Sequence, residues 1–332
     1  MIFKNIVCLL FFFLITGPAI SQPTQITLSP LGKLKNIELD KSLTYDGFEA
    51  NSDYLTWIEY YLNNVVVYNI DKEKEAKIEL TKGRGPNEFQ SIMGLVMDDR
   101  GTLNILDPTN IKFIHVGLTG EFSKDTSPPT GFRPLKMVYG NGYLVILDAL
   151  KPDAIFYLIE DEKYTPIELT GISVSEEFYS PFKKMGHLTI NQNKLIHLTQ
   201  YYPYLYVYDL TSKTLVERIK FDDSDISNDK PFITPDGAAM HAPPSKVGIL
   251  SQDIASVPGM KNRVFILAEG KSKKREYKLN QLHEYDLVKK EFVAVHDLGI
   301  KATRIASNNK YLFVYSKVEN AIYKYEIVSQ NK

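Results

Sequence analysis

The stretch "NSDYLTWIEYYLNNVVVYNID" (residues 51–71) contains a polar turn, an apolar segment, a short polar loop and a second segment rich in Val and Tyr. Neither apolar segment shows the 3.6-residue period of a helix, and β-branched and aromatic residues are frequent in both. Two short segments of this kind, joined by a few polar residues, predict a pair of antiparallel strands.

The same pattern recurs along the rest of the chain. Further copies occupy residues 99–116, 140–160, 191–210, 260–287 and 307–327. The copies follow one another at roughly 45 to 50 residues, with one longer interval before the fifth, which is the length of a four-stranded propeller blade. Six copies therefore predict an all-β fold, a six-bladed β-propeller of four-stranded blades.

The two ends of the chain predict how such a ring is closed. The sixth copy ends near residue 328 and leaves no chain for the outer strand of its blade. "LGKLKNIELD" (31–40) has the pattern of a strand without a partner of its own. If this N-terminal strand joins the last blade, two exposed sheet edges disappear. We expect that closure, with residues 22–332 forming a single domain.

The first residues have a different character. Lys4 precedes the apolar stretch "IVCLLFFFLI" (6–15), which is too short to span a bilayer, and Ala19-Ile20-Ser21 offers small residues for a cleavage site. We expect residues 1–21 to be a cleaved signal peptide. Cys8, the single cysteine, lies inside the apolar stretch, so there is no lipobox. The sequence predicts a periplasmic or secreted protein without a transmembrane segment.

Composition removes several classes of function. A formal net charge of −1 gives no support for nucleic-acid binding. The six histidines show no H-x-H or H-x-x-x-H spacing, and the mature chain has no thiolate ligand. The acidic segment "DDSDISND" (222–229) lacks the central glycine and closing glutamate of a calcium-binding EF-hand loop. We therefore expect neither a metal site nor a cofactor.

The loop "TKGRGPNEF" (81–89) could cradle a phosphate or simply turn the chain. A phosphate loop would be followed by a helix, whereas "QSIMGLVMD" (90–98) has a strand pattern. We expect a turn in which Gly83 and Gly85 permit positive φ angles and Pro86 pushes Gly85 into an extended conformation, while Glu88 accepts backbone N–H bonds and Phe89 packs inward.

The stretch "GRGPNEFQSIMGLVMDDRGTLNILDPTNIKFIHV" (83–116) resembles the G-x-G-P-x-E-F motif and following blade of TolB-like six-bladed propellers exported by bacteria. It is more distantly similar to an NHL-type repeat. This resemblance implies a propeller without a cofactor in an exported setting. It carries over no catalytic residue.

One face of the predicted ring should bear the connections between blades and the loops between the two middle strands. The two longest insertions, residues 222–246 and 269–281, fall on that face, and loops on a rigid scaffold commonly bind ligands. The predicted ligand-binding residues are Arg84, Glu88, Arg133, Lys184, Tyr201, Tyr202, Lys273, Lys274 and Arg275. Cations combined with aromatic side chains suit an anionic glycan or an acidic protein surface.

Two functions remain open at this point. In the first, the protein is a non-catalytic binding or scaffold propeller of the bacterial cell envelope, a monomer that presents this face to an envelope protein or polysaccharide. In the alternative, it is a hydrolase or lyase acting on a sugar or lactone, with Asp107, Asp148 or Glu88 near the central channel. An enzyme should bring several acids, or an acid and a histidine, to the channel. The scattered cations and the missing motifs favour the binding protein, so no catalytic residue is predicted.

Overall fold

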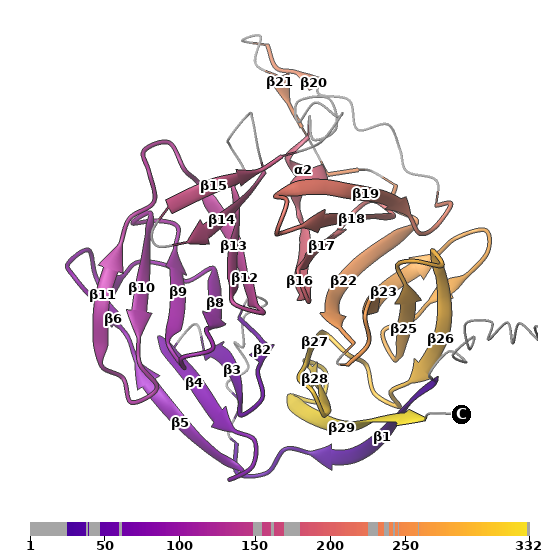
Figure 1. The fold of residues 1–332 in the computed structure, drawn as a ribbon, viewed down its shortest axis with the longest axis horizontal. Helices are drawn as coiled ribbons and strands as arrows, with labels where there is room; N and C mark the ends of the chain where they lie inside the picture. Colours follow the sequence, from indigo (N-terminus) through magenta and orange to yellow (C-terminus); the bar gives the residue numbers. More distant parts are fainter. Residues whose placement is uncertain are drawn as a thin grey trace, which may run out of the picture.

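Six antiparallel sheets are arranged as a ring around a central axis (Figure 1). The computed structural model describes residues 25–37, 39, 47–59, 62–148, 155–160, 163–168, 180–224, 232–235, 239–241, 243–244, 246–257 and 259–330. The prediction of an all-β, six-bladed propeller with four-stranded blades is confirmed. The predicted signal peptide lies outside the described residues.

Each blade is a meander that runs from an inner strand beside the axis to an outer strand at the rim. Blade one contains β2 (Glu49–Ala50), β3 (Tyr54–Glu59), β4 (Asn64–Asn69) and β5 (Lys74–Glu79). Blade two contains β8 (Gly94–Met97), β9 (Leu103–Asp107), β10 (Lys112–Val116) and β11 (Phe122–Thr126). Blade three contains β12 (Pro134–Gly140), β13 (Tyr143–Asp148), β14 (Phe156–Glu160) and β15 (Lys163–Ile167). Blade four contains β16 (Gly186–Asn191), β17 (Lys194–Thr199), β18 (Tyr204–Asp209) and β19 (Thr214–Lys220).

The last two blades carry the irregular features. Blade five contains β22 (Ile249–Ser256), β23 (Arg263–Lys271), β25 (Gln281–Asp286) and β26 (Glu291–Asp297), and β24 (Glu276–Tyr277) pairs with the end of β23. Blade six contains β27 (Arg304–Ser307), β28 (Tyr311–Ser316), β29 (Ala321–Gln330) and the N-terminal β1 (Gln25–Lys33). Short elements in the connections are β6 (Thr81–Lys82), β7 (Glu88–Phe89), β20 (Phe232–Ile233), β21 (Ala239–Met240) and α2 (Pro181–Lys184).

The ring is closed by the N-terminal strand. β1 pairs antiparallel with β29 from Gln25 opposite Gln330 to Lys33 opposite Tyr323, with an irregularity between Pro30 and Gly32. The predicted position of this strand, residues 31–40, is wrong by several residues. Ile26 is the buried residue of β1, whereas Leu34 packs between blades six and one, in the connection to β2.

The apolar core is divided among the interfaces between blades. Six clusters of described residues each join two neighbouring blades, and together they complete the circuit of the ring. Trp57, for example, is fully buried between blades one and six, and Phe156 between blades three and four. Because no cluster fills the axis itself, polar side chains of the inner strands can line it.

The 81–89 loop is a turn capped by Glu88, as predicted, but it does not use the positive φ angles that its glycines permit. Gly85 N–H donates to Glu88 Oε2 at 2.7 Å, and Phe89 is 2% exposed. Neither Gly83 nor Gly85 has a positive φ; Asn87 does, at 61°. A Cβ on Gly83 would lie 2.6 Å from Glu88 Cδ, so these glycines make room for the carboxylate.

The meander gives the ring two distinct faces. The connections between blades and the loops between the second and third strands of each blade lie on one face, which we call the connector face. The tight turns after the first and third strands lie on the other face, which we call the turn face. The predicted site residues belong to the connector face.

Candidate ligand-binding site

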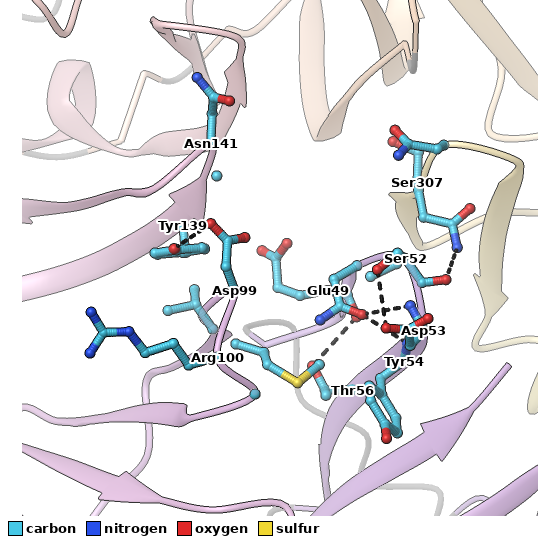
Figure 2. A pocket seen from close by; sticks show the side chains of 18 of the residues that line it. Glu49, Ser52, Asp53, Tyr54, Thr56, Asp99, Arg100, Tyr139, Asn141 and Ser307 are labelled. Carbon is cyan, nitrogen blue, oxygen red and sulfur yellow. Dashed lines mark hydrogen bonds between the residues drawn. The ribbon is translucent and has the colours of Figure 1, made fainter.

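A cavity of about 750 Å³ opens on the turn face. Its walls are the turns between the first and second strands of blades six, one, two and three (Figure 2). Its polar lining residues are Glu49, Asn51, Ser52, Asp53, Tyr54, Thr56, Asp99, Arg100, Tyr139, Asn141, Ser307, Asn308 and Asn309. The volume lies within the range of about 300–1,000 Å³ that is usual for small-molecule sites. We call this space the turn cavity.

Hydrogen bonds hold the walls of the turn cavity in place. Tyr139 Oη donates to Asp99 Oδ2 at 2.9 Å and thereby joins blade three to blade two. Asn51 Oδ1 accepts from the backbone N–H groups of Asp53 at 2.9 Å and Tyr54 at 2.8 Å. Because these side chains are already ordered, a ligand would incur little of the entropy cost of fixing them.

The charges in the turn cavity are mainly negative. Glu49, Asp53 and Asp99 contribute three carboxylates, and Arg100 contributes one cation. In Figure 2 the side chains of Glu49 and Asp99 point into the same open space, while Arg100 extends away from them. This imbalance disfavours an anionic ligand in the inner part of the cavity.

A narrow channel continues from the turn cavity toward the connector face. It contains two smaller cavities of about 170 Å³ and about 50 Å³. Glu49 lines all three spaces, and Asp253 lines both channel cavities. Residues from all six inner-strand regions therefore form one polar passage.

Besides Glu49, four charged or titratable residues meet at the narrow end of this channel: Lys136 of β12, His187 of β16, Asp253 of β22 and Arg304 of β27. His187 Nδ1 lies 3.6 Å from Asp253 Oδ1, too far for a hydrogen bond. Its Nε2 lies 3.3 Å from the carbonyl oxygen of Ser251.

Burial controls the protonation of this pair. It lowers the pKa of His187 well below its ordinary value, and the charges of Lys136 and Arg304 lower it further. Burial raises the pKa of Asp253, while Arg304 and two backbone N–H groups act in the opposite direction. At neutral pH the His187 imidazole is therefore uncharged.

The residues of the turn cavity and channel were not among those predicted from the sequence. The recurring pattern aligned the second and third strands of each blade, and the inner strands of blades one, two and six are too short to show a period of their own. β2 has two residues and β27 has four. One sequence feature could have indicated the channel residues. Glu49 and Asp253 are acidic residues that lie a few positions before the turn leading into a predicted strand.

The nine predicted residues all lie on the connector face, spread over the first five blades. Arg84, Arg133 and Lys273 are exposed there. Lys184 and Tyr202 are only 8% and 5% exposed, and burial lowers the pKa of Lys184. The structure does not gather the nine residues into one cavity.

Several of these predicted residues already have partners within the protein. Lys274 forms an ion pair with Asp223, and the Arg275 guanidinium lies 4.4 Å from the ring centre of Phe292. The rings of Tyr201 and Phe182 meet edge to face at 5.7 Å. These contacts use part of the positive charge and aromatic surface on which the prediction depended.

Two acids predicted to lie near the channel instead hold the connections between blades. Asp107, fully buried, accepts N–H bonds from Gln90 at 2.7 Å and Asn110 at 3.1 Å, among others. Asp148 accepts from the backbone N–H of Arg133 at 2.9 Å. Both end the second strand of their blade, so they face the connecting segment rather than the axis. Their predicted location is wrong, as is that of Glu88, whose carboxylate caps its own loop.

Among the described residues, no group of three or more His, Cys, Asp or Glu is arranged to hold a metal ion. In the acidic segment 222–229, Asp222 accepts hydrogen bonds from Ser224 and Tyr277, each at 2.8 Å. Residues 225–229 lie outside the described part of the chain. In that described part there is also no helix with the length and apolar character needed to cross a bilayer.

The fold and cavity define a six-bladed propeller whose central axis is lined by polar residues, with a wide cavity on the turn face and a narrower channel below it. Residues 50–233, more than half of the chain, match the DUF5128 family of 6-bladed beta-propellers, and the protein belongs to this family. No curated protein matches it by sequence.

Solved structures of other propellers share the fold at low sequence identity. A Bacteroides fragilis protein assigned as exported has 12% identity and a TM-score of 0.58, over 92% of this chain and 95% of that chain. A DUF4221 member from Bacteroides vulgatus has 14% identity and a TM-score of 0.57, over 92% and 99% of the two chains. Virginiamycin B lyase from Staphylococcus aureus has 13% identity and a TM-score of 0.53, over 92% and 100%. At such identities the likeness concerns the fold alone.

Proposed function

We propose that this protein is an exported binding propeller that holds a neutral, hydroxyl-rich ligand, a saccharide, in the turn cavity. The observation that carries the proposal is the concave polar space of about 750 Å³, which combines tyrosines, amides and carboxylates. Amides and carboxylates offer the donors and acceptors that sugar hydroxyls need.

The tyrosines add the second element of sugar recognition. Tyr54 and Tyr139 line the cavity and are half-buried, so each offers an apolar ring together with a hydroxyl group. The surplus of carboxylates argues for a neutral rather than an anionic saccharide. This assignment differs from the anionic glycan suggested by the connector face.

The exported location rests on the first residues of the sequence. The pattern of residues 1–21 and the G-x-G-P-x-E-F motif, which resembles exported TolB-like and NHL-like propellers, both support export. The Bacteroides fragilis neighbour assigned as exported is consistent with it. We propose a periplasmic or secreted monomer, because the ring completes its last blade with its own β1.

The proposal is tested by applying the purified protein to a panel of neutral and acidic oligosaccharides, followed by titration calorimetry. Asn141→Ala, in the wall of the turn cavity, should weaken binding about fivefold or more, since one good hydrogen bond to a polar ligand is worth on the order of 1 kcal/mol or above. The matched control is Asn36→Ala, an exposed asparagine after β1 that has a positive φ like Asn141 and lies outside the turn cavity. If no neutral saccharide is retained, or if both variants bind equally well, this function is wrong.

The connector face remains a separate prediction for an envelope protein or an anionic glycan. Arg84, Arg133 and Lys273 are among its exposed cations. Binding through them should weaken steeply between low and high salt, and Lys273→Ser with Lys274→Ser should weaken it further. Salt-insensitive capture would remove this face from consideration.

One observation favours a catalytic alternative, a hydrolase or lyase acting on a sugar or lactone. The channel below the turn cavity contains the His187–Asp253 pair, an acid and an imidazole 3.6 Å apart. Among the neighbours of the same fold are virginiamycin B lyases. Product formation from a bound saccharide or lactone, lost in His187→Gln while ligand binding persists, would favour the enzyme. Binding without turnover would favour the binding protein.

A further inference from the structure

A second cavity lies next to the turn cavity, between blades two and three. It has a volume of about 310 Å³ and shares Arg100 with the turn cavity. We propose that the ligand is an oligosaccharide of at least two units, with one unit in the turn cavity and the next in this second space, which we call the blade groove. This inference rests on the proposed function and specifies its substrate.

A single turn separates the two spaces. Asp98 Oδ1 accepts the backbone N–H groups of Arg100 at 2.9 Å and Thr102 at 2.8 Å, so the 98–102 turn is firmly folded. Asp99 is drawn toward the turn cavity by its bond to Tyr139. The Arg100 side chain extends away from Glu49 and Asp99, as Figure 2 shows. Asp99 and Arg100, which are adjacent in the 98–102 turn, therefore contribute to two adjacent cavities, Asp99 to the turn cavity and Arg100 to both the turn cavity and the blade groove.

One wall of the blade groove is polar and already ordered. His115 Nδ1 lies 2.8 Å from Asn104 Oδ1, and His115 Nε2 lies 2.9 Å from Thr126 Oγ1. Because the Asn104 oxygen can only accept, Nδ1 carries the proton and Nε2 accepts from the threonine hydroxyl. Lys124 stands on the same wall and is exposed. This wall belongs entirely to blade two.

The opposite wall is apolar and belongs mainly to blade three. It consists of Leu144, Ile159 and Tyr164, all half-buried, and Phe113 of blade two closes the floor. The Tyr164 ring packs edge to face against Phe132 at 5.2 Å, which fixes its orientation. Aromatic contacts of this kind hold a ring in place without using its outer face.

A pyranose ring has the chemistry that this groove offers. Its C–H face is apolar and its rim carries hydroxyl groups, so it can lie against Tyr164 while its hydroxyls meet Lys124 and Arg100. The volume of about 310 Å³ is at the lower end of the range of about 300–1,000 Å³ for small-molecule sites. The shared Arg100 makes the two spaces neighbours, so a glycosidic linkage can cross the 98–102 turn.

Occupying two linked spaces has a measurable consequence. Once the first unit is bound, the second binds from a high effective concentration, which raises the overall affinity without any change at the first site. The affinity for a disaccharide should exceed that for its monosaccharide by about tenfold or more. Longer chains should add little beyond the point at which the groove is filled.

The test is calorimetric titration of the purified protein with monosaccharide to tetrasaccharide of the xylo-, cello-, malto- and manno- series. Tyr164→Ala and, separately, Lys124→Ser should remove most of the gain from mono- to disaccharide and leave monosaccharide affinity unchanged. Tyr323→Ala, a half-buried tyrosine on blade six, is the matched control and should change neither. Thermal melts of each variant establish whether it is folded. If Tyr164→Ala does not fold, Lys124→Ser still tests the proposal, because Lys124 is exposed and its replacement should not disturb the fold.

The outcomes separate the two proposals. Equal affinity for monosaccharide and disaccharide, or groove variants that weaken both alike, would overturn the two-space ligand while the proposed function survives. Failure of every saccharide to bind, or retention of peptides instead, would overturn the proposed function and this inference with it.

Discussion

Replacement of Asp107 by asparagine should destabilise the fold without altering the ligand site. The Asp107 side chain is fully buried at the end of β9 and is surrounded by N–H donors. Its Oδ2 accepts from Gln90 N at 2.7 Å and Asn110 Nδ2 at 2.8 Å, and its Oδ1 accepts from three further backbone N–H groups. An asparagine is nearly the same size, but one oxygen becomes a donor.

The expected loss follows from these bonds. Whichever oxygen is replaced, at least two N–H donors face an amide nitrogen that cannot accept. At about 1–2 kcal/mol for each buried donor left unpaired, the free energy of unfolding should fall by about 2–4 kcal/mol. For a chain of this size, with about 2 °C for each kcal/mol, the melting temperature should fall by about 4–8 °C.

The assay is a thermal melt followed by circular dichroism, supported by urea denaturation of the same samples. Asp297→Asn is the matched control, because Asp297 is exposed and its carboxylate accepts from the N–H of Gly299 in a surface turn. A melting temperature within about 1 °C of the parent protein for Asp107→Asn would refute the role assigned to this carboxylate. A loss of ligand turnover with unchanged stability would instead restore Asp107 as a catalytic candidate.

Three further predictions concern closure, the 81–89 loop and pH. Ile26→Asp buries a charge in β1, where Ile26 is 4% exposed, and should cost about 3–5 kcal/mol and expose the N-terminal strand to limited proteolysis; an unchanged digestion pattern would contradict the closure. Gly83→Ala should displace the Glu88 carboxylate from Gly85 and cost about 1–2 kcal/mol in urea titrations, but almost nothing when Glu88 is already alanine. Burial lowers the pKa of His197 to about 3 and that of His283 to about 4. As pH falls below about 6.5, these histidines therefore become protonated in the unfolded chain but stay neutral in the folded protein. Stability should therefore decline as pH falls from about 7 to 5, by up to about 1.4 kcal/mol for each histidine and pH unit; the lowered pKa of His187 adds to the decline, and the raised pKa of Asp253 acts with the opposite sign. Thermal melts across this range should show a smaller decline in His283→Phe, and an equal decline in both proteins would contradict the reasoning.

The sequence was sufficient to predict the strands that recur as a pattern in every blade. The second and third strands of every blade, such as β3 with β4 and β17 with β18, coincide with the repeated pattern because they are buried almost along their whole length between neighbouring blades and therefore consist of nearly continuous apolar and aromatic residues. The cap that Glu88 forms on Gly85 was also predictable, since both partners are within three residues of each other. The position of the closing strand was harder, because Ile26 and Leu34 are both apolar and their sequence does not say which blade each one packs against.

By itself, the sequence determined a ring of six blades, because six copies of a two-strand pattern at blade length have few other ways to bury their edges. It could not determine the site. The turn cavity joins Glu49 to Ser307 and Asn141 to Asp99, residues from four blades that share no local pattern. The inner strands of blades one, two and six have only two to four residues, too few for a period, and whether the side chains of any inner strand face a neighbouring blade or the axis depends on the closure of the ring. Only the tertiary structure therefore decided which polar residues meet water in the channel and which, like Asp107, are buried to hold the blades together.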